Sequence, residues 1–385
     1  MADDKEGLSS DGAAFWADAL RRFDAVRRWR GNAMDSMGLG RQETAFRIVL
    51  DDPDVRLRLY GEQPASGGPV LLIVPAPIKR GYIWDLLPQV SVVRRYLDAG
   101  FRVYMTEWIE PADPSDDDES GRAEGSRFDG KRGSPLGLAD YADRLILRCA
   151  DAIAEAGDGD RLFIAGHSLG GTLATVFSSL HADRIRGLVV VEAPLHFGAD
   201  SGVFAPVVAG APHAAALREL FGNIPGTFLN MVSAKASPRE FNWDRRMDMI
   251  ASLANPRAFQ THLAVERWTL DEFPIPGRLF EELIEQLYRE DRFARGTLEI
   301  NGRTASPAGL TSPLLAILGN DSQIIPPAAM LPVIEAAHAA NKRTVTYGGD
   351  VGVSLQHVGP LIGRTAHESV WPEVIGWQND IVRAG

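Results

Sequence analysis

A serine between two glycines joins an apolar run to a helical run, and this junction limits the folds open to the chain. The apolar run covers 162–165, the segment Gly166-His-Ser-Leu-Gly170 follows, and helical spacing runs over 169–180. At so sharp a bend, side chains in place of the two glycines would collide with the neighbouring chain. The pattern predicts a strand that turns abruptly into a helix and holds Ser168 in a strained backbone conformation.

Short apolar runs and helical periods alternate on both sides of this junction. We expect strands at 46–55, 70–74, 101–108, 162–165, 188–191, 314–318 and 344–347. We expect helices at 92–99, 138–156, 169–180, 328–340 and 371–382. The alternation is typical of βα units, so it predicts an α/β fold with a mostly parallel central sheet and helices on both faces.

Two segments interrupt this alternation. Residues 111–134 are rich in Asp, Ser and Gly and are expected to form an exposed loop, whose acidic run at 116–119 is better explained as solvated than as a cation site. Residues 199–306 are helical in pattern and predict a cap inserted into the core. The predicted parts are an N-terminal helical segment (1–45), the first part of the core (46–198), the cap (199–306) and the second part of the core (307–385).

Composition excludes some partners. The formal net charge of −11 argues against binding to a nucleic-acid backbone, which needs clustered Lys and Arg. The opening residues Met-Ala-Asp-Asp-Lys-Glu-Gly do not resemble a secretory signal, and apolar runs stay short of the ~18 residues of a spanning helix. We therefore expect no stable membrane insertion and a cytoplasmic location.

The single cysteine, Cys149, is expected to pack in the core.

A serine hydroxyl needs a base to remove its proton, and the base is usually a histidine oriented by an acid. For a serine on such a turn the chain order is serine, acid, histidine, with the acid after a late strand and the histidine after the last one. Asp321 and His357 occupy those positions. We therefore predict a triad of Ser168, Asp321 and His357, with His367 as the alternative base.

The oxyanion that forms during attack on a carbonyl group needs two N–H donors. The N–H of Leu169, directly after the nucleophile, is expected to be one of them. The other is expected from the loop after the strand at 70–74, where Pro75 and Pro77 have no N–H. Ala76, Ile78 and Lys79 remain as donors, and Ile78 is our choice.

Other segments resemble one known family, the polyhydroxyalkanoate synthases, over about residues 45–380. The similar residues are Pro75, Ile78, Arg80, Tyr82-Ile83, Asp85-Leu86, Ser91-Val-Val-Arg94, Ala99-Gly-Phe-Arg-Val-Tyr104, Glu107-Trp108, Asp140-Tyr141, Leu263-Ala-Val-Glu-Arg-Trp268, Gly296-Thr-Leu-Glu-Ile-Asn-Gly-Arg303, His357-Val-Gly359, Trp371-Pro372 and Trp377. The resemblance implies an α/β-hydrolase core with a helical cap. In length the chain is similar to the short synthases that work with a separate partner subunit. The resemblance therefore leaves two assemblies as alternatives, one with a partner subunit and one as a homodimer.

The chain departs from this family at the nucleophile, because the synthases carry cysteine where it has Ser168. A thiolate suits the exchange of acyl groups between thioesters, whereas a serine forms the ordinary oxyester of esterases. We therefore favour a serine hydrolase acting on an acyl ester, a thioester or an aliphatic polyester. The alternatives are a synthase-like acyltransferase using 3-hydroxyacyl-CoA and an inactive relative that binds polyester granules. No cofactor is expected and no metal, since His213 and His262 lack the spacing of metal ligands.

Overall fold

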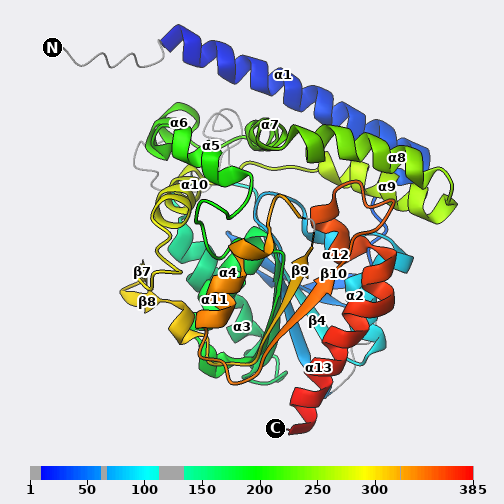
Figure 1. Ribbon diagram of the computed structural model, residues 1–385, viewed down its shortest axis with the longest axis vertical. Helices are drawn as coiled ribbons and strands as arrows, with labels where there is room; N and C mark the ends of the chain where they lie inside the picture. The colour runs from blue at the N-terminus through cyan, green and yellow to red at the C-terminus, as the bar shows by residue number, and fades with distance from the viewer. Residues whose placement is uncertain (1–9, 62–66, 112–133, 321, 385) are drawn as a thin grey trace.

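The computed structural model describes residues 10–61, 67–111, 134–320 and 322–384, and its centre is an eight-stranded sheet (Figure 1). The order is β1-β2-β4-β3-β5-β6-β9-β10. The first three of these strands pair antiparallel, and the others pair parallel. The strands are β1 (Phe46–Asp51), β2 (Val55–Tyr60), β3 (Val70–Val74), β4 (Arg102–Trp108), β5 (Leu162–His167), β6 (Ile185–Val191), β9 (Leu314–Gly319) and β10 (Lys342–Tyr347).

Helices cover both faces of the sheet, as the alternating pattern predicts (Figure 1). One face packs against α3 (Leu145–Glu155), α4 (Leu169–Leu180) and α11 (Leu331–Ala336). The other packs against α2 (Val92–Asp98), α12 (Gly359–Ile362) and α13 (Trp371–Ala384). Cys149 is fully buried on the first face, and burial raises the pKa of its thiol. The fold is therefore an α/β fold with a mostly parallel sheet.

Two predicted elements differ from the structure in kind or by several residues, while several others differ by one to three residues at their ends. The single strand expected at 46–55 is an antiparallel pair, β1 and β2, joined by a turn before Val55. The helix expected at 328–340 is shorter, because a 3₁₀ turn at Pro327–Ala329 precedes α11 and the chain is extended at Ala337. The loop expected at 111–134 lies almost wholly outside the described residues.

A layer of helices lies over the carboxyl ends of the parallel strands (Figure 1). These helices are α5 (Phe204–Gly210), α6 (Ala214–Phe221), α7 (Gly226–Ala236), α8 (Arg245–Ser252), α9 (Pro256–Thr269) and α10 (Gly277–Glu282). A hairpin of β7 (Leu298–Ile300) and β8 (Arg303–Ala305) follows them. We call the helices α5 to α10 the cap; the domain limits drawn from the sequence stay a prediction.

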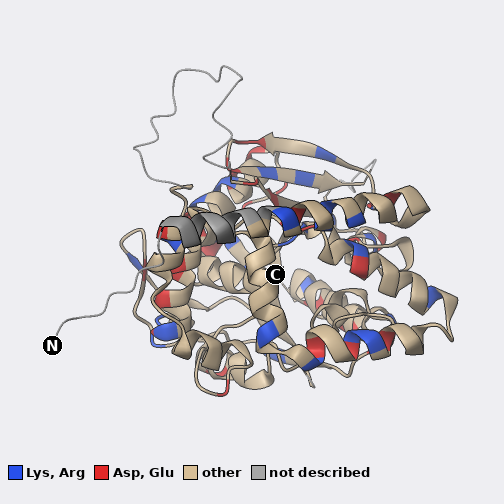
Figure 2. Cartoon of the chain, turned by 90° about the horizontal axis from the view of Figure 1, so that it is seen from above, with Lys and Arg blue, Asp and Glu red and all other residues tan. Residues whose placement is uncertain are grey.

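The N-terminal helix α1 (Ser10–Met34) crosses over the cap and carries several arginines (Figure 2). The turn after it is tied to the cap by Arg267, whose guanidinium donates to Asp35 at 2.6 and 2.8 Å. The cap is tied to the core in turn by Trp268, whose Nε1–H donates to the Arg80 carbonyl at 2.8 Å. No helix in the described ranges is both long and apolar enough to cross a bilayer.

Candidate active site

Ser168 lies on the sharp turn that the sequence predicts, between β5 and α4. Its backbone has φ 54° and ψ −133°. Residues other than glycine rarely adopt a positive φ. The Ser168 N–H donates to the Val191 carbonyl at 3.0 Å, and the Ser168 carbonyl accepts from Gly171 at 2.9 Å. The surrounding backbone therefore holds a strained, half-buried serine at the carboxyl edge of the sheet.

The glycine after Ser168 and Leu169 lets the turn pack against the loop that follows β3. A Cβ atom on Gly170 would lie 2.2 Å from the Val74 carbonyl oxygen and 2.8 Å from the Ala76 nitrogen. A Cβ on Gly166 would lie 2.5 Å from the Gly170 carbonyl oxygen. Both glycines are required because backbone, which cannot rotate away, fills the space.

Gly170→Ala is expected to lower the free energy of unfolding by about 3 kcal/mol, since the new methyl group must displace the β3 backbone. Gly376→Ala is the matched control, because nothing lies within 4 Å of a Cβ at that helical position. There alanine is expected to stabilise by about 0.5–1 kcal/mol through helix propensity. Urea unfolding of both variants measures the difference; equal effects would contradict the close approach.

The ends of four strands converge beside Ser168. Val74 of β3 pairs with Gly166 of β5, and His167 of β5 pairs with Val191 of β6. Strand β9 lies next to β6, and the Glu192 N–H donates to the Ile317 carbonyl at 3.0 Å. The residues that follow these strands are therefore brought together at one edge.

The predicted base His357 lies at this edge, in the 3₁₀ turn Gln356–Val358. Its ring centroid is 4.5 Å from that of His167, the residue before Ser168, and the His167 Nε2–H donates to the His357 carbonyl at 2.8 Å. The structure therefore places His357 against the serine turn. No hydrogen bond joins Ser168 Oγ to His357 within the described ranges, and such bonds are often formed only with substrate present.

The carboxyl group next to His357 is one that sequence reasoning missed. His357 Nδ1 lies 2.9 Å from Glu192 Oε2, and Glu192 is 1% exposed at the end of β6. The predicted acid Asp321 lies outside the described residues. The sequence offers only a weak signal for Glu192, which directly follows the apolar run 188–191 in the strand next to the serine strand.

The alternative base, His367, has both ring nitrogens occupied away from the serine. Arg95 Nε donates to its Nδ1 at 2.8 Å, and its Nε2–H donates to the Leu361 carbonyl at 2.8 Å. Burial, together with the nearby Arg95 charge, lowers the pKa of His367 to about 4. These contacts give His367 a structural role between α2 and α12.

Burial makes charge costly throughout this cluster. It raises the pKa of Glu192 to about 8, against a hydrogen bond from Ser322 that favours the carboxylate. It lowers the pKa of His357 to about 4, so the imidazole is neutral at physiological pH. A neutral imidazole can accept a proton, which a general base requires.

The cap contributes a second buried carboxyl group, Glu240, in the π-helical turn Arg239–Asp244. It is 6% exposed, and neither of its carboxyl oxygens has a hydrogen-bond partner among the described residues. Burial, with the carboxyl groups of Glu192 and Asp244 nearby, raises the pKa of Glu240 to about 7, although the His357 backbone N–H opposes this rise. The folded protein therefore favours protonated Glu240.

Glu240→Gln is expected to raise the free energy of unfolding by up to about 3 kcal/mol at pH 8 and by much less at pH 5. Because the pKa of Glu240 is raised from 4.5 to about 7 on folding, its contribution to wild-type stability is lost as the pH rises through this range. Glutamine does not titrate, so the variant does not lose stability in this way. Urea unfolding at both pH values measures the difference. Glu335→Gln, an exposed position on α11, is the control and should show no such pH dependence; an equal gain there would contradict the prediction.

The predicted oxyanion donors lie on the two segments that meet at Gly170. Leu169 is the first residue of α4, so its N–H has no partner within the helix. Ile78 lies in the turn after β3, where the Lys79 N–H donates to the Ala76 carbonyl at 3.4 Å. Both side chains pack against the same core, and their role as donors stays a prediction.

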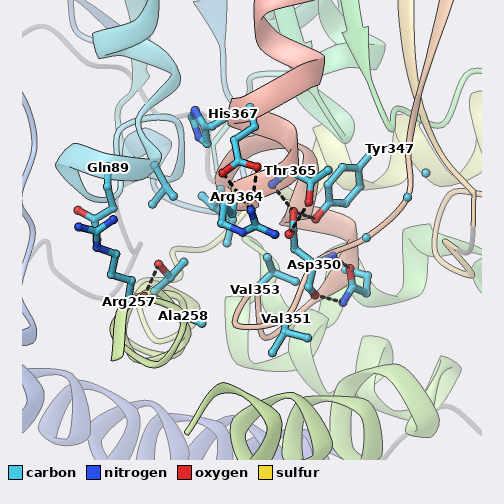
Figure 3. Close-up of a pocket in the computed structure, with 18 of the residues that line it drawn as sticks. Gln89, Arg257, Ala258, Tyr347, Asp350, Val351, Val353, Arg364, Thr365 and His367 are labelled. Carbon is cyan, nitrogen blue, oxygen red and sulfur yellow. Dashed lines mark hydrogen bonds and ion pairs between the residues drawn. The ribbon is translucent and has the colours of Figure 1, made fainter. Parts of the chain in front are cut away.

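A pocket of about 1030 Å³ opens between α9 and the segment that follows β10 (Figure 3). Glu192 and Gln356 line it, whereas Ser168 is not part of its lining. Asp350 braces this segment by accepting from the Thr365 backbone at 2.9 Å and hydroxyl at 2.7 Å (Figure 3). Small solutes in the pocket can therefore approach the acid side of the cluster.

Comparison with known proteins agrees with the fold. The family described as the alpha/beta hydrolase fold matches residues 95–350, and the chain belongs to it. Within that family it lies in the polyhydroxyalkanoate synthase-like branch, as the resemblance implied. The poly(3-hydroxyalkanoate) polymerase subunit of Haloarcula marismortui is 26% identical over 357 residues, covering 90% of this chain and 70% of the relative. That of Allochromatium vinosum is 26% identical over 330 residues, covering 84% and 86%.

Solved structures show the same fold at lower identity. A monoacylglycerol lipase from Paleococcus ferrophilus is 17% identical, with a TM-score of 0.53 over 85% of this chain and 99% of the lipase. A monoglyceride lipase from Saccharomyces cerevisiae is 12% identical, with a TM-score of 0.51 over 89% and 97%. These likenesses concern the fold alone.

Proposed function

We propose that the protein is a serine hydrolase that cleaves carboxylic esters through an acyl-enzyme on Ser168. The observation that carries the proposal is the strained Ser168 on its turn, with the neutral, buried ring of His357 against the preceding residue. The substrate class is an acyl ester, a thioester or an aliphatic polyester such as a hydroxyalkanoate.

The proposed reaction has two halves. Ser168 Oγ attacks the acyl carbonyl carbon while His357 Nε2 takes its proton, and the Leu169 and Ile78 N–H groups stabilise the oxyanion. Collapse breaks the bond to the leaving alcohol or thiol, which receives the proton from His357. Water then attacks the acyl-serine with His357 as base, and the acid is released.

The serine supports hydrolysis over polymer synthesis. A polymerase must pass an acyl chain between covalent sites without losing it to water, and a thiolate suits that exchange because thioester-to-thioester transfer is nearly isoenergetic. An oxyester on serine is the ordinary intermediate of hydrolases. The second candidate, acyl transfer from 3-hydroxyacyl-CoA, is favoured by the relatives, which are named polymerase subunits.

Product analysis tests the proposal. The purified protein is given nitrophenyl esters of several chain lengths and, separately, 3-hydroxybutyryl-CoA. From the nitrophenyl esters we expect nitrophenol and free acid in equal amounts. From the thioester, hydrolysis would give free CoA and free acid without polymer. Polymer formed together with free CoA would support the transferase instead, and no turnover of any ester or thioester would contradict both activities.

A further inference from the structure

Glu192 has a backbone and a surrounding space that fix its carboxyl group. It lies directly after β6 with φ 36°, a left-handed conformation that costs of order 1–3 kcal/mol for a residue other than glycine. Its N–H donates to the Ile317 carbonyl of β9 at 3.0 Å, which ties the strained residue into the sheet. An ordinary strand end does not need the left-handed backbone conformation.

The neighbouring strand leaves room for the Glu192 carboxyl group. A Cβ atom on Gly319, the last residue of β9, would lie 2.1 Å from Glu192 Oε1. The other carboxyl oxygen, Oε2, lies 2.9 Å from His357 Nδ1. Strain, space and this polar contact thus direct the carboxyl group at the histidine ring.

We propose that Glu192 is the positioning residue of His357, the role that the sequence assigned to Asp321. Its carboxylate accepts the Nδ1–H bond, which leaves the Nε2 lone pair free for the proton of Ser168. When Nε2 takes that proton, the Glu192 carboxylate stabilises the imidazolium and remains unprotonated. The inference rests on the proposed hydrolase function, and its tests start from a wild type whose ester hydrolysis is established.

The first test separates positioning from binding. Glu192→Gln is expected to lower kcat by about 10³-fold with KM changed less than about threefold, because an amide cannot stabilise the imidazolium. The kcat of Asp321→Asn is measured beside it and is expected to fall less than that of Glu192→Gln. A Glu192→Gln activity within threefold of wild type, or a larger loss in Asp321→Asn, overturns the proposal and leaves the hydrolase function standing.

The second test uses pH. Three titratable groups face Glu192 among the described residues: His357, Glu240 from the cap and Tyr347 of β10. Burial lowers the pKa of His357 and raises that of Tyr347, so Glu192 and Glu240 are left to titrate near neutral pH. A protonated Glu192 would donate to Nδ1 and force the proton onto Nε2, which removes the base.

Wild-type kcat/KM is therefore expected to fall about tenfold per pH unit below an apparent pKa near 8. Glu240→Gln should keep this acidic limb, whereas Glu192→Gln should lose it. A limb that persists in Glu192→Gln and disappears in Glu240→Gln would overturn the assignment.

The third test is rescue of a missing carboxylate. Glu192→Gly suits the left-handed backbone, and the pocket of about 1030 Å³ gives small anions access to the vacated position. Sodium formate is expected to restore kcat of this variant at least tenfold, while sodium chloride at the same ionic strength should not. A Glu192→Gly variant that folds, is inactive and gains nothing from formate contradicts the positioning role. Circular dichroism of Glu192→Gly and Glu192→Gln reports whether each variant folds.

Discussion

Ser168→Ala is expected to lower kcat for the best ester by about 10⁴-fold while KM changes less than about threefold. The substitution removes the hydroxyl oxygen that is proposed to form the acyl bond, while the turn and the cap stay in place. The remaining rate reflects the oxyanion donors and water. At 1.36 kcal/mol per factor of ten, the loss is about 5 kcal/mol of transition-state stabilisation.

A serine on the same helix gives the matched control. Ser179 lies in α4, and its hydroxyl donates only to the Val176 carbonyl at 2.8 Å. Ser179→Ala is expected to keep kcat within about twofold, because it removes one hydrogen bond within the helix and touches no reacting atom. If Ser168→Ala and Ser179→Ala have similar activity, Ser168 is not the nucleophile.

His357→Ala is expected to lower kcat by about 10³-fold or more, since serine without a base is a poor nucleophile at neutral pH. His338→Ala, an exposed position after α11, is the control and should be unchanged. Initial rates at saturating ester measure both.

The double variant tests whether Ser168 and His357 act as one unit. Residues that share one step are strongly non-additive, so Ser168→Ala combined with His357→Ala should be no slower than Ser168→Ala alone, within about threefold. A double variant whose loss is the product of the single losses would show that His357 acts through another route.

Local pattern predicted the elements that position the site. The strand β3, the helix α4 and the turn between β5 and α4 lie where apolar runs and glycines indicated, because each is determined by neighbours a few residues away. The chain order of serine before histidine followed from the succession of strands. The β1–β2 pair was missed although the segment Asp52-Pro53-Asp54 between the two strands is polar and contains proline, which is a recognisable turn signal.

The partner of His357 could not be predicted in the same way. Glu192 and His357 are 165 residues apart, and their contact depends on the positions of β6, β9 and the turn after β10 in three dimensions. Sequence order fits an acid after either β6 or β9 equally well. The burial of Glu240 is likewise a tertiary effect, since a carboxyl group in a polar-looking cap segment is expected to be exposed.

The most direct measurement of the hydrolase mechanism is the site of acylation. The protein is mixed with a nitrophenyl ester whose acyl group leaves the enzyme slowly, and the reaction is quenched in acid within the burst phase. The protein is then digested, and its peptides are analysed by mass spectrometry. We predict one added acyl mass on the peptide that contains Ser168, formed in step with nitrophenol and lost in step with free acid. Nitrophenol release with the acyl group on another residue, or with no adduct in the burst, would contradict an acyl-enzyme on Ser168.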